Sequence, residues 1–136
     1  VADRARQAFT RTGLAGRTEV FGGDFNANPL PVGADIVTLV RILHDHDDEI
    51  VVRLLEKIRG ILPERGALLI AEPFAQTRGA ERDGDAYFGF YLLAMGQGRP
   101  RSFNELSGML RQAGFSSIRR LRPRRPMLTG ALVAQS

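Results

Sequence analysis

Residues 34–72 read ADIVTLVRILHDHDDEIVVRLLEKIRGILPERGALLIAE, and this stretch decides the fold. Its two ends, Ala34–Val40 and Ala67–Ala71, are apolar runs of the length expected for strands buried on both faces. Between them, the apolar residues of the range 51–62 repeat at helical spacing. Two strands that flank one helix predict a parallel pair joined by a right-handed crossover.

The central helix has recognisable ends. Asp47 is a suitable N-cap, and Asp48 and Glu49 suit the first turn because the helix macrodipole favours negative charge there. Pro63 cannot continue a helix, so we expect the helix to end at about Ile61.

The alternation of strands and helices continues outside this stretch. It predicts an open α/β sheet, and 136 residues suit one domain. We expect helices over residues 2–12 and 86–95, a short strand over 18–21, a loop over 26–33, a helix capped by Ser102 that ends at 113–115, and strands near 117–121 and 127–133.

The composition is that of an ordinary globular protein, with 43% hydrophobic and 25% charged residues. The absence of cysteine excludes a disulfide framework, a thiolate metal site and a cysteine nucleophile. No apolar run in the sequence approaches the roughly 20 residues that span a bilayer, so we expect a cytoplasmic protein.

The net charge of +4 comes almost entirely from arginine, and it is densest at Arg119, Arg120, Arg122, Arg124 and Arg125. No aromatic residue lies among these arginines to stack on bases. A solvated basic loop is the preferred interpretation, and we expect no nucleic-acid partner. A non-catalytic module that binds RNA through this cluster is kept as an alternative.

Polar residues follow the expected strands. His44, Glu72 and Asp24 lie at carboxyl ends of strands, where open α/β sheets bind ligands. A histidine can accept a proton near neutral pH when a carboxylate on its other ring nitrogen fixes the tautomer. Asp45 and Glu72 are both candidates for that carboxylate. A histidine that only satisfies backbone groups at a strand end is the alternative.

The second histidine opens another possibility. His44 and His46 at i, i+2, with Asp47 or Asp48, suit a divalent metal in a small hydrolase. Such sites usually draw a third ligand from elsewhere, and the helix start already accounts for the acidic residues, so we expect no metal. Glycine-rich phosphate-binding and serine-hydrolase motifs are absent from the sequence.

The motifs Gly22-Gly23-Asp24-Phe25, Arg41, Leu43–Glu49 and Glu72 together resemble the class I S-adenosylmethionine-dependent O-methyltransferases of the plant caffeate type and their bacterial relatives. The resemblance implies a Rossmann-like fold and S-adenosylmethionine as cofactor. By this likeness His44 is the general base and Glu72 orients it. The cofactor-binding residues implied are Gly23, Asp24 and Phe25 on the adenine side and Arg41 at the methionine carboxylate.

Residues 84–96, read with the His44 motif, are similar to the carotenoid branch of that family, the hydroxyneurosporene or demethylspheroidene O-methyltransferases. This likeness implies a small hydrophobic substrate, a carotenoid, with peripheral membrane association as a possibility. Core packing explains the same aromatic stripe equally well. The substrate-binding candidates are Tyr87, Phe90, Tyr91 and Met95.

The sequence departs from the family pattern in two places. Pro100 stands where the family has a second supporting glutamate. The chain also starts where the family has finished its second strand, so we expect a carboxyl-terminal part of the catalytic domain, residues 1–136, without the first two strands and the amino-terminal dimerisation domain. The full-length parent is expected to be a homodimer. We expect a bare apolar sheet edge and weak cofactor binding by this chain alone.

Overall fold

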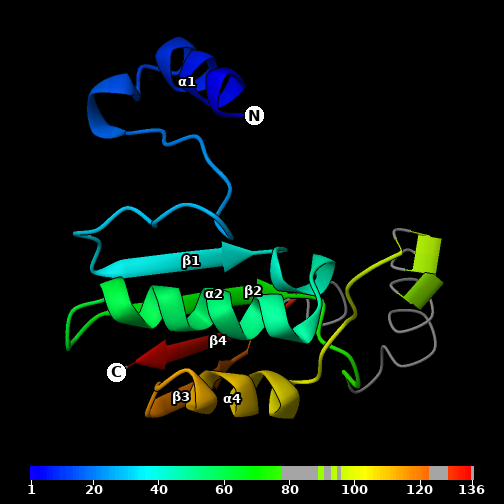
Figure 1. Cartoon of the computed structure of the whole chain (residues 1–136). Coiled ribbons are helices and arrows are strands. Elements are labelled where there is room, and N and C mark those ends of the chain that lie inside the picture. Colours follow the sequence, from blue (N-terminus) through cyan, green and yellow to red (C-terminus); the bar gives the residue numbers. More distant parts are fainter. Residues whose placement is uncertain (78–88, 91–92, 95, 123–128, 136) are drawn as a thin grey trace.

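The computed structural model describes residues 1–77, 89–90, 93–94, 96–122 and 129–135. Its centre is a four-stranded sheet in the order β1-β2-β4-β3 (Figure 1). The strands are β1 Ile36–Val40, β2 Ala67–Glu72, β3 Ser117–Leu121 and β4 Gly130–Gln135.

The pairing of β1 with β2 is parallel, as predicted, with Ile36 opposite Ala67 and Val40 opposite Ala71. Strand β4 runs antiparallel to both β2 and β3. The carboxyl ends of β1 and β2 therefore lie at the same edge of the sheet, which brings the segment after Val40 next to Glu72.

The helices lie mainly on one side of the sheet (Figure 1). They are α1 Ala2–Arg11, α2 Asp48–Ile61 and α4 Phe103–Gln112, with two short 3₁₀ turns, η1 Ala15–Arg17 and η2 Leu43–Asp45. The bounds of α2 confirm the predicted helix. Residues 89–90 and 93–94 are helical, and the rest of the helix predicted over 86–95 lies outside the described residues. None of the described helices is long and apolar enough to cross a membrane.

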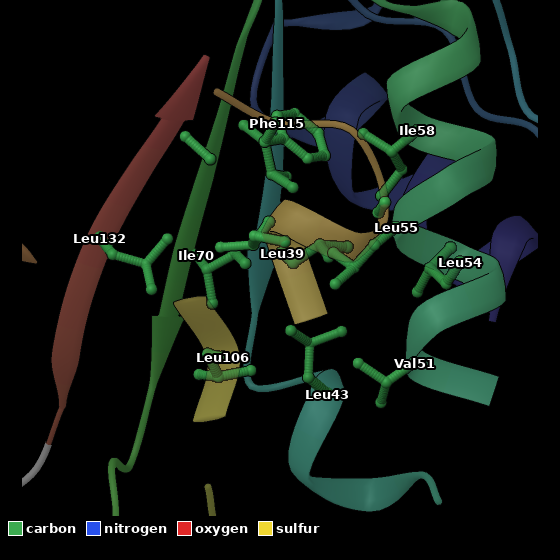
Figure 2. Packing of buried hydrophobic residues seen from close by; sticks show 14 of the residues in the cluster. Leu39, Leu43, Val51, Leu54, Leu55, Ile58, Ile70, Leu106, Phe115 and Leu132 are labelled. Carbon is green, nitrogen blue, oxygen red and sulfur yellow. The ribbon is translucent and has the colours of Figure 1, made fainter. Parts of the chain in front are cut away.

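The hydrophobic core lies between α2, α4 and one face of the sheet (Figure 2). Burial alternates along β2 and β4, so each strand turns one set of side chains to the helices. Helix α1 lies apart from the sheet and buries no residue (Figure 1). The largest fully buried members of the core are Leu43, Val51, Leu55, Ile58, Leu68, Ile70, Leu106, Leu110, Leu132 and Phe115.

The prediction that residues 34–40 form a strand buried on both faces is wrong. The strand starts at Ile36, and Leu39 is 8% exposed while Ile36 and Val40 are 64% and 55% exposed. Burial alternates along β1, with Val37 and Leu39 more covered than their neighbours, so the described residues cover a single face of it. The strand also lies at the edge of the sheet, with a partner on one side only. The expected bare apolar edge is therefore present.

The prediction of a strand over residues 18–21 is also wrong, since the structure assigns that segment to no strand. A strand needs a neighbour for its backbone hydrogen bonds, and the described sheet offers none here. The carbonyl of Val20 instead accepts a hydrogen bond from Nη2 of Arg6 at 2.9 Å. The last strand starts at Gly130, and residues 127–128 of its predicted range lie outside the described residues.

Candidate active site

The turn η2 carries His44 directly after β1. Arg41, with φ of 55°, turns the chain out of the strand, and its N–H makes a last bond to the carbonyl of Ala71 at 2.9 Å. Positive φ is uncommon for a residue other than glycine, and such conformations gather at functional sites. The turn buries the His44 side chain, which is 4% exposed, against the end of β2.

Glu72 binds this turn through both carboxylate oxygens. Its Oε1 accepts the N–H groups of Ile42 at 2.7 Å and Leu43 at 2.8 Å, and its Oε2 lies 2.5 Å from Nδ1 of His44. The Glu72 side chain is 2% exposed. Because a carboxylate only accepts hydrogen bonds, it places the proton on Nδ1 and leaves the lone pair of the neutral ring on Nε2.

The second candidate carboxylate lies on the other side of the ring. Oδ1 of Asp45 is 3.2 Å from Nε2 of His44, and this buried oxygen makes no hydrogen bond. The structure thus separates the two carboxylates that sequence reasoning left as alternatives. Glu72 engages Nδ1, the nitrogen that sets the tautomer, and Asp45 lies beside Nε2, the nitrogen that would exchange a proton.

The candidate cofactor residues form a tight turn before β1. The N–H of Asp24 donates to Oδ1 of Asn28 at 2.8 Å, and Oδ1 of Asp24 accepts the N–H of Asn26 at 2.8 Å. A Cβ on Gly23 would lie 2.9 Å from Oδ1 of Asn28, so only glycine fits without a shift. A cavity of about 340 Å³ is lined by this turn, residues 21–25 and 28–31.

Lys57 ties this turn to α2, which sequence reasoning missed. Its ammonium donates to the carbonyls of Phe25 at 2.8 Å, Asn26 at 2.9 Å and Asn28 at 3.3 Å. The Phe25 ring meets His46 edge to face, with ring centroids 5.1 Å apart. The candidate cofactor turn and the His44 turn are therefore in contact through these two rings.

Arg101 is the second residue that the sequence did not reveal. Its side chain is buried, and it donates to the carbonyls of Leu43 and His46, each at 2.7 Å, and to Oδ1 of Asp48 at 2.6 Å. Hydrogen bonds from Arg99 and Arg101 hold the pKa of the Asp48 carboxyl below its usual value, against the opposing effect of burial. Asp48 thus anchors two arginines besides starting α2.

Asp47 occupies the N-cap position as predicted, yet its side chain makes no cap hydrogen bond. Its Oδ1 instead accepts the N–H of Gly98 at 3.1 Å. The side chain therefore joins the start of α2 to the segment before α4 and leaves the first turn of the helix uncapped.

The candidate substrate residues are only partly described. Tyr87, Tyr91 and Met95 lie outside the described residues, and Phe90 is 74% exposed. A cavity of about 450 Å³ opens beside the same helical segment and is lined by Asp47, Gly89, Leu93, Gly96, Gln97, Gly98, Arg99 and Pro100. Pro100 therefore lies at this cavity, where it cannot supply the carboxylate that the family pattern has.

The two alternative functions receive no support from the described geometry. The His46 ring packs on Phe25, and no group of three potential metal ligands occurs among the described residues. Arg120 lies over the rings of Phe74 and Phe103, at 6.0 and 5.6 Å from their centroids, so it is engaged within the protein. Arg124 and Arg125 of the arginine cluster fall outside the described residues.

Comparison with known proteins gives the class of this fold and site. Residues 1–116 match the O-methyltransferase domain family, and the chain belongs to that family. The predicted partial, Rossmann-like methyltransferase fold is thereby confirmed.

The similarity extends to individual relatives. Demethylspheroidene O-methyltransferase of Cereibacter sphaeroides is 43% identical over 134 residues, which are 98% of this chain and 35% of that protein. The structure of the mitomycin 7-O-methyltransferase MmcR matches all of this chain and 39% of its own, with a TM-score of 0.88 and 30% identity. Human N-acetylserotonin methyltransferase in complex with SAM matches 83% of this chain and 32% of its own, with a TM-score of 0.68 and 29% identity. The chain spans about a third of the length of the curated relatives it matches.

Proposed function

We propose that the protein transfers a methyl group from S-adenosylmethionine to a hydroxyl of a small apolar substrate, with His44 as the general base. The observation that carries this proposal is the buried pair of His44 and Glu72. The Glu72 carboxylate binds Nδ1 of His44, so the lone pair of the neutral ring lies on Nε2, which can accept a proton. Membership of the O-methyltransferase family supports the reaction class.

The side chains suggest how proton removal would work. An alcohol is a weak acid, so proton transfer to Nε2 of His44 must accompany formation of the new carbon–oxygen bond. The Glu72 carboxylate would then stabilise the imidazolium, and its bonds to the N–H groups of Ile42 and Leu43 keep the ring in place. Most of the acceleration is expected from the alignment of the reacting oxygen with the methyl group.

The turn at residues 23–28 fits the adenine side of the cofactor. It offers the Asp24 carboxylate, an acceptor suited to an exocyclic amino group, and the Phe25 ring beside a cavity of about 340 Å³. Arg41, at the end of β1, would meet the carboxylate of the methionine moiety. Bound S-adenosylmethionine would supply the methyl group and leave as S-adenosylhomocysteine.

We propose a carotenoid as the substrate, of the hydroxyneurosporene or demethylspheroidene type. The support is the 43% identity to a demethylspheroidene O-methyltransferase along nearly the whole chain. The apolar side chains of Phe90 and Leu93 are exposed beside the second cavity, where a long polyene would find contact surface. A homodimer, a cytoplasmic location and peripheral membrane association in the full-length protein are part of this proposal.

The experiment is a methyl-transfer assay of the full-length protein with labelled S-adenosylmethionine and two acceptors, a hydroxylated carotenoid in detergent micelles and caffeate. The proposal predicts labelled methyl ether from the carotenoid and little from caffeate. Transfer to caffeate alone would refute the substrate while preserving the reaction. Absence of transfer to either acceptor by protein that binds the cofactor would contradict the proposed function.

A further inference from the structure

Arg101 is a buried cation. Apart from a bond to the Arg99 carbonyl at 3.4 Å, the hydrogen-bond partners of its side chain belong to the turn that carries His44 or to the helix start that follows it. The side chain is 2% exposed. Burying a charge is costly unless the charge is paired and fully hydrogen-bonded. Here Asp48 supplies the countercharge through Oδ1, 2.9 Å from Nε and 2.6 Å from Nη2.

Two further donors of the guanidinium bind backbone carbonyls on either side of the base, one residue before His44 and two residues after it. Nη1 donates to Leu43 and Nη2 donates to His46, each at 2.7 Å. The N–H groups of the same turn are taken by Glu72 at Ile42 and Leu43. The donors and the acceptors of the turn are thus bound by two different buried side chains, which leaves its backbone little freedom to rotate.

The segment Gly98–Arg101 crosses this turn in direct contact. A Cβ built on Gly98, which has φ of +77°, would lie 2.2 Å from the carbonyl oxygen of His44. Such an approach is possible only for glycine. The segment is held at the side by Arg99, whose guanidinium pairs with Asp48 at 2.9 Å and with Glu105 at 2.6 Å.

We propose that Gly98–Arg101 is a positioning segment for the base and that Arg101 is its principal positioning residue. The inference rests on the proposed function, because it assigns the segment a role in the work of His44. Arg101 touches neither ring nitrogen. It acts by fixing the carbonyls on both sides of His44, and hence the direction in which Nε2 points.

The segment also contains a departure from the family pattern. Pro100 cannot act as a second supporting carboxylate. Arg101, directly after it, binds backbone carbonyls of the His44 turn, and the N–H of Gly98 donates to the Asp47 side chain.

The test compares Arg101→Lys with the same substitution at an exposed arginine, Arg65→Lys, in the full-length protein. Lysine keeps the charge but cannot bind both carbonyls and Asp48 in one plane. Arg65 is a matched control, since it undergoes the same change of side chain at an exposed position between α2 and β2, outside the proposed positioning segment. The readouts are kcat per cofactor-binding site, KM for the acceptor, and the pH profile of kcat.

We expect Arg101→Lys to lower kcat per site roughly 10- to 100-fold, because a base displaced by about 1 Å loses that much. Its pH profile should change, since Glu72 and Asp45 face the two ring nitrogens at altered distances. Arg65→Lys should keep the wild-type kcat and profile. A purely structural role would reduce the number of binding sites and leave both quantities per site unchanged, which would overturn the inference.

A second variant guards against misfolding of the first. Gly98→Ala pushes on the His44 carbonyl from the other side, and we expect a similar loss of kcat with cofactor affinity retained. Loss of cofactor binding in both variants would also overturn the inference, because the segment would then serve the fold alone. The proposed function is judged separately, by the activity of the wild-type protein and of His44→Ala.

Discussion

Replacing Glu72 by glutamine separates its electrostatic role from its shape, because the two side chains are isosteric. Glutamine has one acceptor oxygen and one donor amide. In the favoured orientation the oxygen keeps the N–H groups of Ile42 and Leu43, and the amide faces Nδ1 of His44. The opposite orientation would set the amide against two backbone donors, at the distances of 2.7 and 2.8 Å that Glu72 now spans.

An amide facing Nδ1 reverses the tautomer of His44. Nδ1 must then accept, so the proton moves to Nε2, where Oδ1 of Asp45 at 3.2 Å can accept it. The base no longer has a lone pair for the substrate. An orienting carboxylate replaced by its amide in a serine protease lowers kcat by about 10⁴, and we expect a loss of roughly 10³- to 10⁴-fold in Glu72→Gln.

The assay is single-turnover methyl transfer by full-length protein saturated with S-adenosylmethionine, with the cofactor Kd measured by calorimetry. The Kd should change little, because glutamine keeps the bonds to Ile42 and Leu43 and so keeps the His46 ring against Phe25 of the candidate cofactor turn. Glu64→Gln, at an exposed position, removes the same charge and should keep the wild-type rate. A Glu72→Gln rate within about threefold of wild type would refute the tautomer argument.

Three further predictions concern the supports of the site. Lys57→Met removes the hydrogen bonds that hold the turn at residues 23–28. It should raise the Kd for S-adenosylmethionine about tenfold in calorimetry, because the loss of one charged hydrogen bond costs about 1.4 kcal/mol. The kcat at saturating cofactor should stay unchanged. Leu55→Ala leaves a cavity at a core position that is 0% exposed, and it should lower the free energy of unfolding by about 2–5 kcal/mol in urea titrations. Glu56→Ala, on the exposed face of the same helix, should lower it by less than about 0.5 kcal/mol. The backbone N–H of Ser102 and the guanidinium of Arg99 lower the pKa of Glu105 from 4.5 to about 2, so its contribution to stability is present above pH 4.5 and is lost as the pH falls toward 2. Glu105→Gln should therefore be less stable than wild type at pH 6 and should approach it near pH 2 in the same titrations, and an equal difference at both pH values would contradict this reasoning.

The sequence predicted the parts of the site that follow from local pattern. The run at Ala67–Ala71 and the helix that ends at Ile61 are both present, and their parallel arrangement alone brings His44 to Glu72. The spacing of apolar residues indicates which segments form helices and strands. The parallel strand-helix-strand connection then indicates which strand ends lie side by side. Residues separated by 28 positions were therefore correctly expected to lie together.

What the sequence did not reveal depends on contacts between loops, for which no period exists. No sequence pattern marks Arg101 or Lys57, because the importance of both comes from carbonyls that the fold brings to them. A signal was available for the first, since Arg101 directly precedes the Ser102 N-cap and Glu105 of a capping box, which fixes the loop before α4. The strand predicted over residues 18–21 failed because extended sequence forms a strand only beside a partner.

The most direct test of the account is His44→Ala in the full-length protein. The candidate cofactor turn meets the His44 turn through the rings of Phe25 and His46, which this substitution leaves in place, so the Kd for S-adenosylmethionine should stay within about threefold of wild type. Methyl transfer at saturating cofactor should fall by at least about 10³-fold. His44→Ala protein that binds the cofactor and still methylates its acceptor at the wild-type rate would contradict the central claim that His44 is the base.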